Sequence, residues 1–427
     1  MGITLRICAL ALAAATAAVT ADPDAQELFD RAREKVLDNA RRMPRYTCVE
    51  NITRTQYQPA VVSPSKRQLV TRVAGCYARQ MGGSRGDLLL RGRLRLDVTV
   101  VRDGEIFSWA GAGKFETADV GELVGDGASG SGEFGSFLAS VFGSAPDEVR
   151  YAGLRNSLAL FEYNVPVATS NYRLHMTGPA RTIGFHGTFS VDPSDGDVQQ
   201  LVVESGQFDQ TDRICSIRHV MDYGRLKIGS GDFLLPEVST MDAIYRNGQE
   251  SLNETRYSDC REYVGESTIR FDDADASFRP AASKAVLQPL PSNVRLLIGL
   301  SKPIDTETAA AGDPVEGVLL RDVPGKQGAL ARINDHVHGR ILRLQQYMEP
   351  PTPRWIVAIR FDTVERDGMT EPIALKPIDD GDRSAQCVRG PVPVVAYQRP
   401  KDAGVFVFSE HGNIVLDRRF ISEWETR

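Results

Sequence analysis

The sequence is poor in the residues that build metal and redox sites. Its 427 residues contain six histidines, six cysteines and three tryptophans, and no two cysteines form a C-x-x-C pair. Metal knuckles and thioredoxin-type redox sites are therefore disfavoured, because both need closely spaced cysteines. Basic blocks are also lacking, since 50 Lys and Arg are interspersed with 56 Asp and Glu and leave a net charge of −6. This balance gives no reason to expect nucleic acid as a partner.

Sustained apolar runs are absent except at the very start of the chain. Arg6 gives a basic beginning, residues 7–18 are apolar or small, and residues 19–21 read "VTA", with small side chains suited to cleavage. We interpret residues 1–21 as a secretory signal peptide, with Cys8 too early to be a lipidated mature N-terminus. Because no later stretch approaches roughly 18 apolar residues, we expect no transmembrane segment and a periplasmic or secreted protein.

The cysteines that follow the signal peptide are interpreted as disulfide partners, because an exported protein folds in an oxidising compartment. We predict that neighbours in the sequence pair, Cys48 with Cys76 and Cys215 with Cys260. Cys387 is then left over. We expect it to be a buried free thiol, with a reactive or intermolecular thiol as the alternative.

Helical periodicity opens the mature chain. Asp22 can cap a helix and Pro23 can occupy its first turn, while Pro44 ends it. One apolar stripe recurs at three- to four-residue intervals, formed by Leu28, Phe29, Ala32, Val36 and Ala40.

From Tyr46 onward the periodicity changes to two. In "LRLDVTVV" the apolar residues Leu94, Leu96, Val98 and Val100 alternate with polar ones. Similar segments follow, separated by Asp-Gly, Asp-Pro and Asn-Gly turn signals. This pattern predicts a mainly β fold, an antiparallel curved half-barrel over residues 22–278 whose apolar face needs a cover.

A second β-rich region follows a lapse in periodicity. Residues 279–293 are rich in proline and small residues, and we interpret them as a linker. Residues 294–427 then contain further alternating segments with little helical periodicity. A small closed β-barrel would bury these strands without exposed edges.

The stretch "GSGEFG" matches G-x-G-x-x-G through Gly130, Gly132 and Gly135. A dinucleotide site also needs a strand before the loop and an acidic residue about 20 positions later, and both are missing. We instead predict a lid helix after the loop, with the glycines as its hinge. Its apolar stripe consists of Phe134, Phe137, Leu138, Val141 and Phe142.

Other matches to functional motifs are weaker. "GGSRG" places Ser84 in G-x-S-x-G, but the flanking segments do not fit a nucleophile elbow. His336 and His338 would share one face of a strand, as a metal pair could. The acidic run at 272–277 lacks the glycine and distal glutamate of an EF-hand loop. We therefore predict no catalytic residue, metal or cofactor.

Three segments together resemble a known family. They are "VVRDGEIFSWAG", "GTFSVDPSDGDVQQLVV" and "MDYGRLKIGSGDFLLPEVSTM", and their turns and aromatic residues are similar to those of the periplasmic lipoprotein-carrier (LolA/LolB-like) superfamily over roughly residues 25–270. The resemblance implies a curved half-barrel with helices over its concave face. The whole chain is also similar to exported proteins of soil bacteria such as the Acidobacteria, and residues 294–427 resemble a small envelope β-barrel module.

Three functions follow as hypotheses. The first is a non-catalytic envelope protein that binds an apolar ligand, a lipid, an acyl chain or a lipoprotein, or a partner segment in its half-barrel. The second is an envelope scaffold that docks other proteins through residues 294–427. The third is a hydrolase or metalloenzyme, which would need Ser84, His336, His338 and a carboxylate to converge in one pocket.

Overall fold

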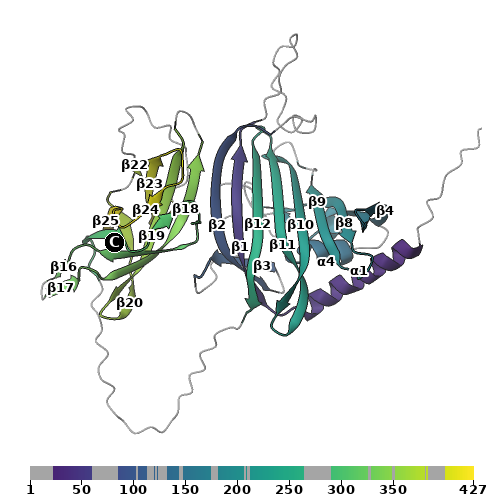
Figure 1. The fold of residues 1–427 in the computed structure, drawn as a ribbon, viewed down its shortest axis with the longest axis horizontal. Helices are drawn as coiled ribbons and strands as arrows, with labels where there is room; N and C mark the ends of the chain where they lie inside the picture. Colours follow the sequence, from purple (N-terminus) through teal and green to yellow (C-terminus); the bar gives the residue numbers. More distant parts are fainter. Residues whose placement is uncertain are drawn as a thin grey trace, which may run out of the picture.

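The computed structural model shows a chain built mainly from antiparallel strands, in two groups that lie side by side (Figure 1). It describes residues 23–59, 85–101, 104–112, 120, 123, 132–143, 148–174, 181–205, 208, 212–263, 290–325, 328–348, 352–379, 381–382 and 400–427. The predicted signal peptide and most of the predicted linker lie outside these residues. The domain boundaries therefore stay a prediction. Among the described helices, none is long and apolar enough to cross a membrane.

The first group combines helices with a long curved sheet. Its helices are α1 (Pro23–Arg42) and α4 (Ser136–Gly143), with a short 3₁₀ turn η2 (Val167–Thr169). Its strands are β1 (Tyr46–Tyr57), β2 (Leu88–Val101), β3 (Gly104–Trp109), β4 (Val149–Arg155), β5 (Leu158–Val165), β6 (Arg173–Leu174), β7 (Arg181–Thr182), β8 (Phe185–Val191), β9 (Val198–Ser205), β10 (Ile214–Ile228), β11 (Gly231–Tyr245) and β12 (Glu250–Glu262).

Antiparallel pairing orders this sheet as β4-β5-β8-β9-β10-β11-β12-β1-β2-β3. The order follows the chain from β4 to β12 as a meander, and β1 then enters between β12 and β2. The sheet is open, with β4 and β3 as its outermost strands. The predicted antiparallel half-barrel with helices is confirmed.

Local sequence explains the turns of this meander. Between β8 and β9 the Asp192 carboxylate accepts a hydrogen bond from the Ser194 backbone N–H (2.8 Å), and Gly196 takes a φ of +82°. Between β11 and β12 the φ of Gly248 is +86°. Glycine adopts these angles without the steric cost that a Cβ would bring, so both predicted turns form where the sequence signals them.

The disulfide pairing differs from the prediction. Cys48 on β1 bonds to Cys260 on β12, with the two Cα atoms 4.0 Å apart. The predicted pairs Cys48–Cys76 and Cys215–Cys260 are therefore wrong. β1 and β12 are neighbours in the sheet, and a register shift beside Cys48 brings Cys260 opposite it. Cys215 is disulfide-bonded, as predicted, but not to Cys260. Cys76 and Cys387 lie outside the described residues.

The second group is also a sheet of antiparallel strands, with a short parallel pair between β22 and β23. Its strands are β13 (Arg295–Leu300), β14 (Ile304–Asp305), β15 (Pro314–Leu319), β16 (Val323–Gly325), β17 (Gly328–Ala331), β18 (His336–Tyr347), β19 (Arg354–Arg366), β20 (Met369–Pro372), β21 (Leu375–Pro377), β22 (Gly381–Asp382), β23 (Gly404–Ser409), β24 (Val415–Leu416) and β25 (Ile421–Thr426).

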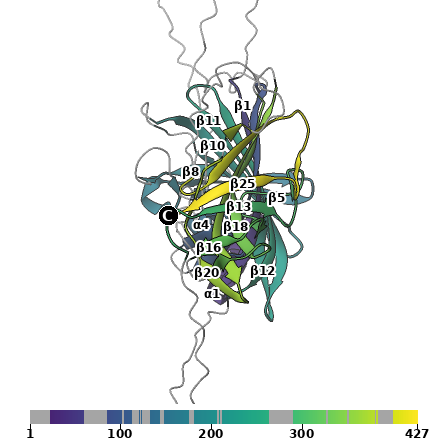
Figure 2. The ribbon, with the colours of Figure 1, turned by 90° about the vertical axis from the view of Figure 1, so that its left-hand side faces the viewer.

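Pairing orders the main strands of this group as β21-β25-β13-β15-β18-β19-β23. Figure 2 looks onto this group, with β13, β18 and β25 facing the viewer. Its core contains the fully buried rings of Trp424 and Phe361, packed edge to face at 5.3 Å. β20 also pairs with β19, but no pairing between the described strands closes this sheet. The predicted closed β-barrel is therefore not confirmed.

One strand joins the two groups. The edge of β2 that faces away from β1 pairs in turn with β3, with a bridge at Ala311 and with the end of β18. Backbone hydrogen bonds run from Arg95 N–H to the Ala311 carbonyl (2.7 Å) and from Ala311 N–H to the Arg93 carbonyl (2.9 Å). The junction is thus a continuation of the sheet hydrogen bonding, and it lies between β2 and β18 in Figure 1.

Candidate functional site

Helices α1 and α4 cover the inner face of the first sheet. Leu28, Phe29, Ala32 and Val36 of α1 are buried there, as the predicted stripe requires. Ala40, the last predicted member, is exposed. Asn39 is buried in its place, and its side chain both donates to the Leu234 carbonyl (3.1 Å) and accepts from the Leu234 N–H (2.8 Å). A polar side chain therefore ends the stripe, because it satisfies backbone groups of β11.

The predicted lid residues are all buried, but they belong to two parts of the core. Phe137, Leu138, Val141 and Phe142 lie on α4 and pack into the same cluster as α1. Phe134 precedes the helix and contacts Tyr46 and Tyr257 in a separate cluster. The stripe therefore continues from the helix into the loop before it.

The glycine-rich loop before α4 binds a carboxylate of the protein itself. Glu105, at the start of β3, accepts hydrogen bonds from the backbone N–H of Gly132 (2.9 Å) and of Phe134 (3.3 Å). Gly132 has a φ of +125°, which a side chain would disfavour. Of the predicted hinge residues, Gly130 lies outside the described part, Gly132 is held by Glu105, and Gly135 begins the turn into the helix.

Three buried carboxyl groups lie near one another beneath this loop, those of Glu50, Glu105 and Glu133. Burial, opposed by the two backbone hydrogen bonds, raises the pKa of Glu105 to about 7. Burial and the neighbouring Glu105 raise the pKa of Glu133 to about 8. Burial, together with the nearby Glu133 and Glu105, raises the pKa of Glu50 well above its usual range. The cluster therefore holds protons near neutral pH, because several charges cannot be desolvated together.

A buried histidine borders this cluster. His219 on β10 is fully buried, and its Nε2 atom shares a hydrogen bond of 3.0 Å with the Tyr172 hydroxyl. Its Nδ1 atom lies 3.7 Å from a Glu133 oxygen and has no hydrogen-bond partner in the described part of the chain. Burial lowers the pKa of His219 to about 4, so the ring is neutral near pH 7.

Aromatic rings fill most of the space between the helices and the sheet. Phe142 on α4 stacks on Phe29 of α1 at 6.0 Å and contacts Phe189 at 4.9 Å, and Phe189 stacks on Phe161 at 5.0 Å. The wide apolar cavity that a bulky ligand would need is therefore already occupied by the protein's own side chains.

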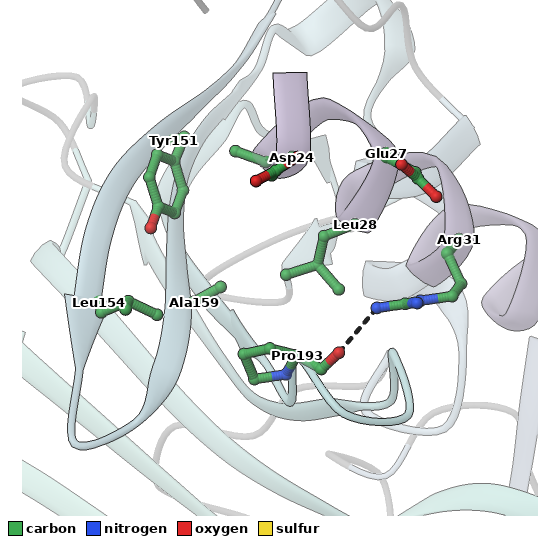
Figure 3. Close-up of a pocket in the computed structure, with 9 residues that line it drawn as sticks. Asp24, Glu27, Leu28, Arg31, Tyr151, Leu154, Ala159 and Pro193 are labelled. Carbon is green, nitrogen blue, oxygen red and sulfur yellow. Dashed lines mark hydrogen bonds between the residues drawn. The ribbon is translucent and has the colours of Figure 1, made fainter. Parts of the chain in front are cut away.

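An opening remains at the first turn of α1, where the helix meets the β4–β5 hairpin and the β8–β9 turn (Figure 3). This pocket has a volume of about 330 Å³. Leu28, Tyr151, Leu154, Ala159 and Pro193 supply apolar surface. Charged groups of α1 form its rim, namely Asp24, Glu27 and Arg31. We call this opening the α1 pocket.

A hydrogen bond and two ion pairs hold the β8–β9 turn, one wall of the α1 pocket, against α1 and β10. Arg31 donates to the Pro193 carbonyl (2.8 Å). One turn later Lys35 reaches Asp197 (2.6 Å), which also accepts two hydrogen bonds from Arg225 (2.6 and 2.7 Å). Burial would raise the pKa of Asp197, but these cations lower it overall. The β8–β9 turn is thereby held against the helix.

Of the residues in the hydrolase or metalloenzyme hypothesis, the structure describes His336 and His338. The rings of His336 and His338 stack at 6.3 Å on β18 in the second group, and the described residues contain no cluster of three or more side chains that could hold a metal ion. Ser84 and the acidic run at 272–277 lie outside the described residues.

Sequence reasoning missed the buried acid cluster, although a signal was present. Glu50 lies on the same strand face as the buried residues Cys48 and Ile52, and Glu105 on the same face as Phe107 and Trp109. His219 likewise shares its face with Ile217 and Met221. A charged residue on the inward face of an amphipathic strand is costly unless it is paired or protonated. Such a residue is thus a readable mark of a buried polar site.

Comparisons with known proteins give limited similarity. No family model and no curated protein matches this chain. The crystal structure of a LolA superfamily protein from Nitrosomonas europaea is similar, with 12% sequence identity and a TM-score of 0.20. The match covers 56% of this chain and 94% of that one.

Proposed function

We propose that this protein is an exported, non-catalytic envelope protein that binds an apolar ligand, such as one acyl chain, in the α1 pocket. The observation that carries the proposal is the pocket itself, with a volume of about 330 Å³ and an apolar floor beneath a charged rim. Its volume lies at the low end for small-molecule sites and suits a single chain. The Cys48–Cys260 disulfide supports export, because such bonds persist in oxidising compartments.

An exposed leucine supports this location. Leu154 lines the pocket from the β4–β5 hairpin with 69% of its surface exposed. Tyr151 lies on the same hairpin, and Leu28 of α1 lies across the opening (Figure 3). An apolar ligand in the pocket would cover this side chain. The hydrophobic effect would then contribute about 25 cal/mol for each Å² removed from water.

A longer ligand would have to displace α4, the proposed lid. The helix buries Phe137, Leu138, Val141 and Phe142, and each such side chain is worth roughly 1.5–3 kcal/mol. Lifting the helix therefore requires a ligand that replaces most of these contacts. Gly132 and Gly135 are the proposed hinge, and lifting the helix would also break the hydrogen bonds from the Gly132 and Phe134 N–H groups to Glu105.

Binding of a fluorescent fatty acid tests the proposal, together with mass spectrometry of lipids that copurify with protein from its native compartment. We expect uptake by the wild type and a marked loss in Leu154→Glu, which places a charge in the opening. Leu226→Glu is the matched control, because Leu226 is an exposed leucine (40%) that does not line the pocket. Wild-type protein that neither carries lipid nor takes up the probe contradicts the proposal.

The lid has its own test. Phe137→Asp and Phe142→Asp each place a charge in the filled interior, so we expect lower stability and altered uptake of the probe. Unchanged stability and uptake in both variants would show that α4 is not a lid.

A scaffold role is the second candidate, and the filled interior favours it. Aromatic rings occupy the space that a large ligand would need, and residues 294–427 present an additional sheet to partners. Crosslinking in cells through positions in 294–427 should then capture envelope proteins. Capture of none, together with lipid uptake, would leave ligand binding as the function.

A further inference from the structure

The outer face of the first sheet carries a group of arginines beside the second group of strands. In the antiparallel register Arg93 is opposite Thr53, which is opposite Glu254. In the next row Arg95 is opposite Asn51, which is opposite Arg256. Because alternate residues of a strand share one face, these side chains project from the sheet together.

Two hollows lie on this face and meet at Arg93 and Thr53. The first has a volume of about 200 Å³ and also includes Arg95 and Arg256. The second, of about 260 Å³, includes Arg91 and reaches Thr306, Trp355 and Asn413 of the second group. We call this continuous site the arginine groove and define it by Arg91, Arg93, Arg95 and Arg256.

Among the described residues, Arg93 and Arg256 keep more free hydrogen-bonding capacity than Arg91 and Arg95. Arg95 pairs with Asp313 and also donates to Asn51 (2.9 Å), and Arg91 donates to Gln346 (2.8 Å). Arg93 makes only a long contact of 3.4 Å with the Thr306 carbonyl. Within the described residues, no carboxylate forms an ion pair with Arg93 or Arg256.

We propose that the arginine groove binds a single anionic group of a ligand, a phosphate or a carboxylate, between Arg93 and Arg256. Guanidinium groups bind the oxygens of such anions with two parallel hydrogen bonds, and the Thr53 hydroxyl can supply a further donor. Glu254 and Glu307 also line the hollows. Their charges oppose a polyanion and favour a ligand with one anionic group.

This site is separate from the α1 pocket, since the two share no residue. It also depends on both parts of the chain. Residues 306–313 form one wall and are fixed by the backbone hydrogen bonds between Ala311 and β2. The ligand would therefore contact both groups of strands at their junction.

Isothermal titration of the mature chain with glycerol phosphate and with acetate tests the proposal at low ionic strength. Cosedimentation with phosphatidylglycerol vesicles, against phosphatidylcholine vesicles, tests a lipid headgroup as the source of the anion. We expect saturable binding in at least one arm, and a loss of roughly tenfold in affinity for Arg93→Gln and for Arg256→Gln. Binding of the soluble anions identifies a solute site, and binding of vesicles alone identifies a headgroup site.

Arg155→Gln is the matched control, because Arg155 is an exposed arginine at the end of β4, outside the groove. It should bind like the wild type, and circular dichroism should show that all variants are folded. The proposal is overturned if the wild type binds in neither arm. It is equally overturned if folded Arg93→Gln and Arg256→Gln bind no more weakly than Arg155→Gln.

Discussion

The Glu105 carboxylate and the Gly132 backbone N–H, 27 residues apart, are joined by a hydrogen bond of 2.9 Å. A second bond from the Phe134 N–H reaches the other carboxylate oxygen. Converging backbone N–H groups in a glycine-rich turn bind anions in many proteins. In this protein such a turn holds the Glu105 carboxyl group of the neighbouring strand β3, and the contact ties the entry of α4 to the sheet.

Removing this carboxylate should destabilise the protein. Glu105→Ala leaves two buried N–H groups without their acceptor, and each such group costs roughly 1–3 kcal/mol. Urea unfolding should therefore show a lower free energy of unfolding, by about 2 kcal/mol or more. Glu162→Ala is the control, since Glu162 has a half-exposed side chain that pairs, among the described residues, with exposed Arg150. It should change stability by less than about 1 kcal/mol. Equal effects of the two substitutions would contradict the assigned role of Glu105.

Stability should depend on pH in two directions. The raised pKa values of Glu105 (about 7) and Glu133 (about 8) mean that folding favours their protonated forms. Their contribution is complete below the unfolded pKa of 4.5 and is lost as pH rises through 7 to 8. The lowered pKa of His219 (about 4) acts oppositely, since its contribution is complete above pH 6.5 and is lost as pH falls through 4.

Thermal unfolding across pH 4 to 9 measures both limbs. We expect the highest Tm at mildly acidic pH, between about 5 and 6.5. Glu133→Gln should flatten the alkaline limb because it removes one of the titrating carboxyls. A wild-type Tm that rises steadily from pH 6 to 9 would be inconsistent with buried, protonated glutamates.

Gly132 should not tolerate a side chain. Its φ is +125°, and an added Cβ would lie 3.3 Å from the Phe137 ring. Gly132→Ala should therefore lower the free energy of unfolding by roughly 1–3 kcal/mol. Gly143→Ala, at the end of α4, is the control because an added Cβ there meets nothing within 4 Å. The same measured loss for both would argue against a backbone requirement at Gly132.

The disulfide can be mapped chemically. Proteolysis without reduction should yield a peptide pair joined through Cys48 and Cys260, which are separated by 212 residues. A crosslink over that span is worth about 5 kcal/mol in the loop-entropy model, so Cys48→Ser should lower stability strongly. A linked pair containing Cys48 and Cys76 would refute the pairing.

Local features of the chain were readable from the sequence, because each depends on residues within one turn or one strand. The three- to four-residue spacing of Leu28, Ala32 and Val36 predicted α1, and alternation in Leu94–Val100 predicted β2. The acid at Glu105 could have been noticed in the same way. It shares a face with Phe107 and Trp109, a position where a charge needs explanation.

Contacts between distant segments were decided only by the tertiary structure. Cys48 bonds to Cys260 because β1 enters the sheet between β12 and β2, and strand order is not encoded in the periodicity of any single strand. The same holds for Glu105 and Gly132, and for β2 with β18. Periodicity determines which face of an element is buried, whereas the free energy of the whole packed core determines which element lies against it.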